Sequence, residues 1–208
     1  MAAPPKSKLP PIPTSERPTF AGPESPESPF PIRVSGPIIK GFGRGSSSLG
    51  IPTANIPIAG LDVGGNSSLE SGVYYGYAAV PKGTGAGKPE GTGEAEVWDM
   101  CMSVGWNPFY QNERRSVEVH IIHKFPKNFY GAPLKILVLG FIRPEYDYKS
   151  LEALIDDINF DVTVTENSLK REAYAKLRSD EWLRRVDDVD MSLKDEEPRP
   201  KESEDEKL

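Results

Sequence analysis

The sequence has little cysteine, no excess of positive charge and no long apolar run. Cys101 is the single cysteine in 208 residues, which excludes an internal disulfide and favours a reducing compartment. The formal net charge is −6. Because nucleic-acid binders normally carry a basic surface that neutralises phosphates, we do not expect nucleic acid as a partner. No stretch approaches the roughly 20 apolar residues that span a bilayer, so we expect no membrane span.

The first 29 residues hold few large apolar side chains and are rich in proline. Ten of the 21 prolines lie between Pro4 and Pro31. Such a composition buries too little apolar surface to offset the entropy of ordering, so we expect residues 1–29 to form a disordered tail. A polyproline ligand is the alternative. The segment lacks the features of a secretory signal or a transit peptide, which favours a cytoplasmic location over a mitochondrial association.

Between residues 30 and 145 the sequence indicates a succession of strands. Six extended segments, most of them rich in valine, isoleucine and aromatic residues, are bounded by glycine, proline or asparagine. Because no helical pattern separates them, we expect antiparallel hairpins that form a small β-barrel. The Gly- and Ser-rich linkers 59–71 and 81–93 are expected to be flexible insertions. The predicted strands are Ile32–Lys40, Thr53–Pro57, Gly72–Val80, Glu94–Val104, Ser116–Lys124 and Leu134–Arg143.

Helical patterns appear only after the strands. Ser150 can cap a first helix, and a second is predicted from about Thr165 to Trp182. Residues 186–208 are mostly acidic and are expected to form a solvated tail. The folded domain is therefore predicted over residues 30–185, mainly β with C-terminal α-helices. The apolar residues that recur at helical spacing in the first helix are Leu151, Leu154, Ile155 and Ile158.

A glycine-rich segment, Gly41-Phe42-Gly43-Arg44-Gly45, follows the first predicted strand. Alternate glycines allow positive φ angles and close approach to a ligand, and backbone N–H groups in such loops can hold phosphates. The segment lacks the Gly-Lys-Ser/Thr of a Walker loop and the following helix of a dinucleotide fingerprint. A glycine turn that binds nothing is the alternative.

Two neutral oxygen donors stand close together in the segment Pro52-Thr53-Ala54-Asn55. In an extended chain Thr53 and Asn55 point to the same side. Hydroxyl and amide oxygens are hard ligands that suit Mg²⁺, but without charge they need the phosphates of a nucleotide to complete its shell. A capped turn without a metal is the alternative.

Strict alternation characterises the segment Ser116–His123. It places Glu118 and His120 on one face of a strand and valines on the other. Glu118 is a candidate general base if that face lines a site, and a solvated surface charge otherwise. His120 and His123 are three residues apart and fall on opposite faces of a strand, so they do not predict a metal site.

Taken in order, these segments resemble the riboflavin kinase family in its monofunctional eukaryotic form, from about Ile32 to Leu183. The resemblance implies a six-stranded antiparallel Greek-key β-barrel with a C-terminal helix. It also implies ATP-dependent phosphorylation of the terminal ribityl 5′-hydroxyl of riboflavin, which gives FMN and ADP. The matching motifs are Gly-Phe-Gly-Arg-Gly at 41–45, Leu-Gly-Ile-Pro-Thr-Ala-Asn at 49–55, Gly-Val-Tyr-Tyr-Gly at 72–76, Ser-Val-Gly-Trp-Asn-Pro at 103–108, Glu-Val-His-Ile at 118–121, Phe-Tyr-Gly at 129–131 and Gly-Phe-Ile-Arg-Pro-Glu at 140–145.

The resemblance further implies roles for individual residues. Glu118 would be the catalytic carboxylate. Thr53 and Asn55 would bind the metal, Mg²⁺ or alternatively Zn²⁺ or another divalent ion. The residues that would embrace the ATP phosphates are Gly41, Gly43, Arg44, Gly45 and Ser47. Those that would border the adenine nucleotide are Ile121, His123 and Tyr130. Those that would face the flavin are Arg143, Tyr146 and Tyr148.

Two other functions compete with this interpretation. A non-catalytic flavin- or nucleotide-binding barrel would keep the glycine segment and the flavin side but lack the metal pair or the carboxylate. A bifunctional kinase and FAD synthetase would need a second domain with a nucleotidyltransferase signature. The expected ligands are riboflavin, FMN, ATP and ADP, and the expected state is a monomer.

Overall fold

The computed structural model describes residues 9–40, 51–57, 63–85, 93–106 and 115–193. All six predicted strands are present within three residues of their expected ends, because alternation and glycine or proline boundaries are local signals. The strands are β1 (Ile32–Pro37), β2 (Ala54–Ile56), β3 (Gly72–Pro81), β4 (Ala95–Trp106), β5 (Arg115–Ile121) and β6 (Pro133–Arg143).

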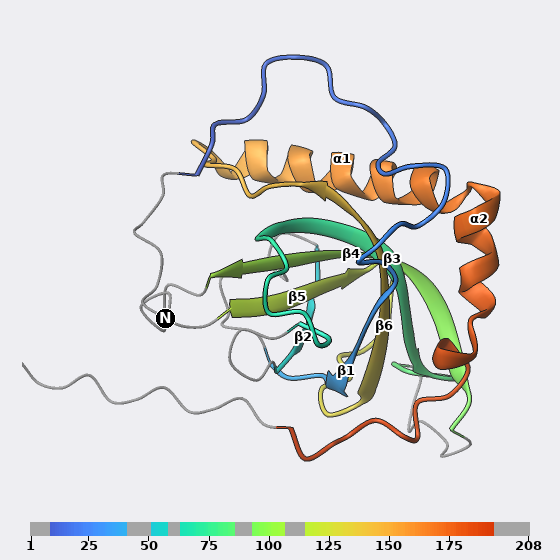
Figure 1. Ribbon diagram of the computed structural model, residues 1–208. Coiled ribbons are helices and arrows are strands. Elements are labelled where there is room, and N and C mark those ends of the chain that lie inside the picture. The colour runs from blue at the N-terminus through green and yellow to red at the C-terminus, as the bar shows by residue number, and fades with distance from the viewer. Residues whose placement is uncertain (1–8, 41–50, 58–62, 86–92, 107–114, 194–208) are drawn as a thin grey trace, which may run out of the picture.

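The strands form one antiparallel sheet in the order β1-β6-β3-β4-β5-β2. Strands β3, β4 and β5 follow one another, and β6 returns to lie beside β3, which is Greek-key connectivity. Register shifts between β3 and β6 increase the bend of the sheet. Beyond β1, the N–H of Ile39 donates to the carbonyl of Asn55 at 2.9 Å. The sheet therefore curls into a half-barrel (Figure 1), which confirms the predicted fold class.

Alternate side chains of the strands enter two hydrophobic clusters. Tyr74, Met102 and Val119 belong to the inner cluster, inside the curl of the sheet. Tyr75 and Tyr77 belong to the outer cluster, which Leu183 also joins from the C-terminal part of the chain. Strands β3 and β6 are therefore buried on both faces, whereas much of the outer face of β5 stays partly exposed.

Helix α1 (Leu151–Leu169) begins where the sequence predicts. The hydroxyl of Ser150 accepts a hydrogen bond from the N–H of Ala153 at 3.2 Å, as expected of an N-cap. The apolar stripe is not the buried face, however, since Leu151 is 50% exposed. Polar residues face the sheet instead. The buried polar side chains of α1 are Asp157, Asp161, Thr165 and Ser168.

The predicted second helix from Thr165 to Trp182 is wrong in its extent. Thr165 belongs to α1, and only short turns follow, namely α2 (Glu172–Ala175) and the 3₁₀ segments η2 (Lys176–Ser179) and η3 (Glu181–Leu183). The break falls at Arg171, whose backbone is extended, with φ −64° and ψ 138°. Its guanidinium donates to the carbonyl of Gly22 at 2.9 Å, so a contact with the distant N-terminal segment accompanies the break.

Residues 9–29, which we call the N-terminal strap, lie along α1 before the chain enters β1 (Figure 1). The N–H of Ala21 donates to Ser168 Oγ at 2.9 Å, and Asn167 donates to the carbonyl of Thr19 at 3.1 Å. The structure therefore differs from the expected disordered tail over these residues. Polar groups of the strap that would be solvated in a free tail are paired with side chains of α1.

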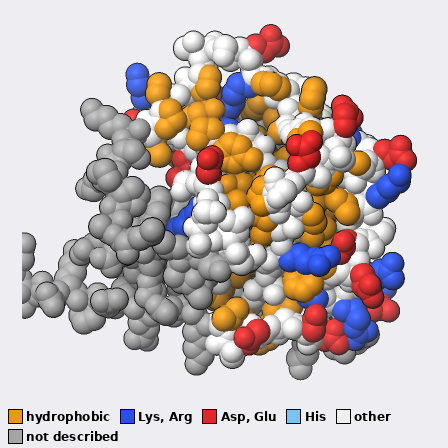
Figure 2. All heavy atoms as spheres, viewed as in Figure 1, with side chains coloured by type: hydrophobic (Ala, Val, Ile, Leu, Met, Phe, Trp, Pro, Cys, Tyr) orange, Lys and Arg blue, Asp and Glu red, His pale blue; other side chains and the backbone are white. Residues whose placement is uncertain are grey.

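The described part of the C-terminal tail and the linker before β3 differ from expectation in a similar way. Val186 and Val189 are buried in the outer cluster, and the N–H of Val186 donates to the carbonyl of Gly93 at 3.1 Å. In the linker before β3, Val63 and Leu69 are buried in the inner cluster. Figure 2 shows charged side chains of both signs along the edge followed by the C-terminal residues, and hydrophobic side chains gathered in the middle of this face.

Candidate active site

The outer face of β2, β5 and β4 carries a row of three polar residues, which we call the central row. Asn55 of β2 pairs with Glu118 of β5, and Glu118 pairs with Ser103 of β4. Side chains paired across antiparallel strands point to the same face, with Cβ atoms about 4.5–5.5 Å apart. The neighbouring Val117 and Val119 are buried in the inner cluster, which confirms the predicted alternation around Glu118.

The Pro-Thr-Ala-Asn segment is tied to β5 by a histidine. Nδ1 of His120 lies 3.0 Å from the carbonyl oxygen of Pro52, which accepts a hydrogen bond when that ring nitrogen carries the proton. His120 stands on the same face of β5 as Glu118. Thr53, partly buried, immediately precedes β2. The structure therefore brings the segment of Thr53 and Asn55 beside Glu118, as the predicted site requires.

Glu145 adds a second carboxylate to this face. Its Oε1 lies beside Gly105 of β4, and an added Cβ at that position would lie only 2.4 Å away, so a larger residue there would displace the carboxylate. Gly105 follows Ser103 by two residues and shares its face. Burial raises the pKa of Glu145, the charges of Arg115 and Arg143 oppose the shift, and Glu118 adds to it. Sequence reasoning assigned no role to Glu145, although it lies within the Arg-Pro-Glu motif.

Arg115 places a buried positive charge near Glu145. It is the first residue of β5, and only 6% of its surface is exposed. Within the described part of the chain, its Nε and Nη2 atoms have no hydrogen-bond partner. Burial lowers the pKa of the guanidinium, while Tyr74 and Glu145 oppose the shift. A buried guanidinium with two donor atoms that lack hydrogen-bond partners is costly, so this end of β5 is suited to an anionic group.

On the other side of the face, Arg143 ends β6 in a cluster that we call the Arg143 network, formed by Arg143, Asp157, Asp161 and Tyr148. The Nε and Nη2 atoms of Arg143 donate to Asp161 at 2.9 and 2.6 Å, and Nη2 lies 3.1 Å from Asp157. The hydroxyl of Tyr148 donates to Asp157. Although burial opposes it, the hydrogen bonds and charge of Asp161 raise the pKa of Arg143. The network explains why α1 buries its aspartates.

The predicted flavin residues therefore lie together. The guanidinium of Arg143 stands 4.8 Å from the ring centre of Tyr146, which is buried, and Tyr148 joins the same network. Burial and the hydrogen bond to Asp157 raise the pKa of Tyr148 above its ordinary value. The Coulombic interactions of Glu145 with both Arg143 and Glu118 link this cluster to the central row.

The residues predicted at the adenine nucleotide lie at and beyond the far end of β5. Ile121 is buried in the inner cluster, His123 is exposed and Tyr130 is 54% exposed. The ring of His123 stacks on Trp98 with 3.7 Å between centroids. The N–H of Gly131 donates to the carbonyl of Ile38 at 2.8 Å, which ties this region to the chain that leads into the glycine segment.

Five predicted phosphate-binding residues lie outside the described residues, and their roles stay predictions. They are Gly41, Gly43, Arg44, Gly45 and Ser47. For a metal, the described donors are hydroxyl, amide and carboxylate oxygens from Thr53, Asn55 and Glu118. Within the described ranges no three His, Cys, Asp or Glu residues form a metal-binding group. This donor set fits a hard divalent ion that arrives with nucleotide phosphates.

The family model and the curated relatives agree on one family. The family model for riboflavin kinase, Flavokinase, matches residues 28–169. The riboflavin kinase of Pyricularia oryzae is 51% identical over 162 residues, covering 76% of this chain and 81% of that protein. The riboflavin kinase of Aspergillus fumigatus is 48% identical over 191 residues, covering 78% and 88%. That of Meyerozyma guilliermondii is 45% identical over 181 residues, covering 79% and 98%.

A solved structure gives the same answer. The crystal structure of riboflavin kinase from Trypanosoma brucei has a TM-score of 0.54 and 30% sequence identity, and the match covers 73% of this chain and 88% of that one. Among the described residues, no helix has both the length and the apolar character needed to cross a membrane. The family model and these relatives together show that the chain belongs to the riboflavin kinase family.

Proposed function

We propose that the central row and its neighbours carry out the ATP-dependent phosphorylation of riboflavin at its ribityl 5′-hydroxyl, giving FMN and ADP. One observation carries the assignment of the site. The pairing of Asn55 with Glu118 and of Glu118 with Ser103 sets an amide, a carboxylate and a hydroxyl side by side. The Arg143 network adjoins them through Glu145. This face therefore offers both a hydrophilic reaction centre and an aromatic ligand side.

Glu118 acts on the ribityl hydroxyl. Phosphoryl transfer has a loose transition state, so catalysis depends mainly on alignment and charge stabilisation. A carboxylate is a weak base toward an alcohol. Glu118 therefore orients the hydroxyl toward the γ-phosphorus and accepts its proton late, as the new bond to phosphorus forms.

Thr53 and Asn55 hold the divalent ion, for which Mg²⁺ is the first candidate and Zn²⁺ the alternative. When bound, the ion supplies positive charge that offsets the negative charge of the nucleotide phosphates. Because both donors are neutral, they bind the ion well only when the phosphates of ATP complete its coordination shell.

The two substrates approach from different sides of Glu118. Arg143, Tyr146 and Tyr148 face the isoalloxazine ring, since aromatic side chains and a guanidinium can stack against a planar ring system. Ile121, His123, Tyr130 and the glycine segment hold the nucleotide. A non-catalytic binding barrel is disfavoured because the carboxylate and both metal donors are present. Monomeric state and cytoplasmic location remain part of the proposal, to be tested by sedimentation and cell fractionation.

The decisive experiment is the Glu118→Gln variant. Glutamine keeps the shape and can still orient a hydroxyl weakly, but it cannot accept the proton. We expect kcat for FMN formation to fall by about 10²–10⁴-fold, with riboflavin and ATP still bound. Glu172→Gln is the matched control, since Glu172 lies exposed on α2 in an ion pair with Lys176. Near-normal turnover in Glu118→Gln would refute the catalytic assignment.

A further inference from the structure

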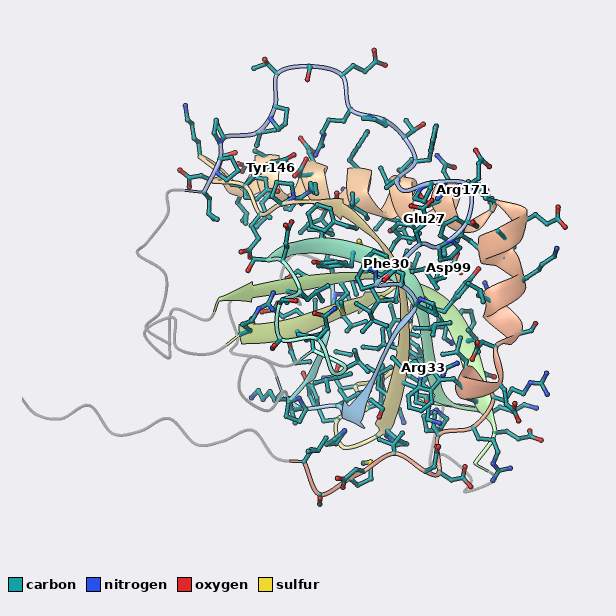
Figure 3. The ribbon with its side chains drawn as sticks, in the orientation of Figure 1. Glu27, Phe30, Arg33, Asp99, Tyr146 and Arg171 are labelled. Atoms are coloured by element: carbon teal, nitrogen blue, oxygen red, sulfur yellow. The ribbon has the colours of Figure 1, made fainter. Side chains whose placement is uncertain are left out.

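The N-terminal strap is an addition to the region that defines the family. The family model begins at residue 28, so residues 9–27 of the strap lie outside it. Figure 3 shows Tyr146 at one end of α1 and Arg171 at the other, with the strap passing over the helix between them. At the Arg171 end the strap is held by hydrogen bonds from that guanidinium to the carbonyls of Ala21, Gly22 and Pro23.

At the other end, the strap reaches the residues assigned to the flavin. The N–H of Asp147 donates to the carbonyl of Pro10 at 3.0 Å, and Pro11 forms a parallel bridge with Asp147. Asp147 stands between Tyr146 and Tyr148. The main chain of the strap therefore fixes the backbone from which both aromatic rings project.

Arg17 makes the closest side-chain contact between the strap and this site. Its Nη2 donates to Oδ1 of Asp157, across 140 residues of sequence. The other oxygen of the same carboxylate, Oδ2, accepts from the hydroxyl of Tyr148 and lies 3.1 Å from Nη2 of Arg143. The guanidinium of Arg17 also lies 4.3 Å from the ring centre of Phe160, which fixes its direction.

Asp157 is thus shared by three donors, and only 3% of its surface is exposed. Arg17 occupies one oxygen and leaves the other to Tyr148 and Arg143. Without Arg17, the carboxylate can rotate and draw Arg143 away from Asp161, and the Tyr148 hydroxyl loses its fixed acceptor. Riboflavin would then have to order these side chains when it binds, which weakens affinity.

We infer that Arg17 is a positioning residue for riboflavin, acting through Asp157 on Tyr148 and Arg143. The inference rests on the proposed assignment of the flavin side. It places a determinant of substrate affinity in a segment that precedes the family region. Arg17 holds the carboxylate of Asp157, which is part of the flavin side and not of the central row. Loss of Arg17 should therefore change the affinity for riboflavin, and not the affinity for ATP or the rate of phosphoryl transfer.

The test uses the full chain with Arg17→Met, which keeps an apolar stem over Phe160 but removes the charge. We expect the KM for riboflavin to rise about 5–30-fold, with the KM for ATP and kcat changed less than about twofold. Arg17→Lys should recover part of the affinity because it restores the charge. Arg185→Met is the matched control, since it removes an exposed arginine–aspartate pair with Asp187.

Two further variants distinguish a failure of the role of Arg17 from a failure of the flavin-side assignment. In an Asp157→Asn background, Arg17→Met should add little to the riboflavin KM, because the two residues act as one unit. Tyr148→Phe reports on the flavin side itself. If Tyr148→Phe raises the riboflavin KM and Arg17→Met only lowers the melting temperature, the role of Arg17 is overturned while the flavin assignment stands. If Tyr148→Phe leaves the riboflavin KM unchanged, the flavin assignment fails, and the role of Arg17 fails with it.

Discussion

The two sides of the candidate site are held in place by different physical means. On the flavin side, Arg143, Asp157, Asp161 and Tyr148 come from the end of β6, the segment that follows it and α1, and they are joined by buried charges and hydrogen bonds. In the central row, Asn55, Glu118 and Ser103 are set by the hydrogen-bonded ladder of β2, β5 and β4. Side chains thus hold the first region together, whereas the backbone holds the second.

This difference predicts how the regions respond to mutation. On the flavin side, the groups that face the ligand also join α1 to β6, so their loss should affect stability and binding together. In the central row, a side chain can be changed while the ladder stays intact, so activity should fall without loss of stability. Four predictions test this contrast, from the largest expected effect to the smallest.

Asp161→Ala should give the largest effect. It removes the bidentate carboxylate partner of Arg143 and leaves Asp157 as the one carboxylate in contact with a buried guanidinium among the described residues, so the free energy of unfolding should fall by about 3–5 kcal/mol. Urea denaturation measures this change. Asp99→Ala is the control, because Asp99 pairs with Arg178 at a partly exposed position and its loss should cost less than about 1 kcal/mol. An equal, small loss in both variants would remove the contrast between the two sides.

Thr53→Ala should leave stability nearly unchanged and alter the response to the metal. Loss of one neutral oxygen donor should raise the Mg²⁺ concentration for half-maximal FMN formation about tenfold, equivalent to about 1.4 kcal/mol. The free energy of unfolding should change by no more than about 0.5 kcal/mol. Thr53→Ser keeps the hydroxyl and should behave like the parent. An unchanged magnesium titration in the alanine variant would contradict the assigned role.

Alkaline pH should weaken the fold through buried tyrosines. Burial, with a contribution from Asp99, raises the pKa of Tyr77 from 10.0 to about 12. Between these values the folded chain retains a phenol proton that the unfolded chain releases, so the free energy of unfolding falls as pH rises through this window. Urea denaturation at several pH values measures the slope.

The tyrosines of the two regions can then be compared. Tyr77→Phe should flatten the alkaline slope without affecting catalysis, because Tyr77 lies in the outer cluster. Tyr148→Phe should also flatten the slope, since the pKa of Tyr148 is raised too, but it should weaken riboflavin binding as well. A slope that neither variant changes would show that other groups control the alkaline response.

The smallest effect concerns the single thiol. Cys101 is buried beneath α1, where the hydroxyl of Thr165 lies 3.6 Å from its sulfur, and burial raises its pKa to about 12. The native protein should therefore not react with Ellman's reagent at pH 8, whereas the unfolded chain should react once. Asp161→Ala should increase the rate by loosening α1, and Thr53→Ala should not. Rapid reaction of the native parent would show that α1 does not seal this position.

The sequence predicted the strands, and it predicted Asn55 and Glu118 of the central row, because both depend on local patterns, whereas the part of Ser103 came from the strand register. Alternation placed Glu118 on the outer face, and the Pro-Thr-Ala-Asn motif identified the neighbouring strand. The buried face of α1 escaped prediction because Asp157, Asp161 and Thr165 form a polar stripe of the kind that usually faces solvent. The partners of these aspartates are distant in sequence: Arg143 is 18 residues from Asp161, and Arg17 is 140 residues from Asp157. The spacing of four residues from Asp157 to Asp161 and to Thr165 was the one sequence signal that could have identified this buried face.

The order and position of the strap were missed for the same reason. Proline-rich segments with few large apolar residues resemble disordered tails when judged by composition. Here carbonyl groups of the strap meet donors such as Arg171 and Asn167, which only the folded helix assembles. The composition of a segment indicates how much apolar surface it can bury by itself, but it does not indicate which hydrogen-bond donors another part of the chain places beside it.

Both ends of the chain complete the outer surface of β3 and β6. The N-terminal strap contributes Ala21, while Leu183, Val186 and Val189 arrive from the C-terminal side. During synthesis the strap leaves the ribosome before the helix and the arginine that receive it, which are made about 150 residues later. Domains form as units once their parts are available. The earliest described segment to be made therefore packs only after α1 and Arg171 have been made. The outer face of the sheet is covered only after the last described residues have been made.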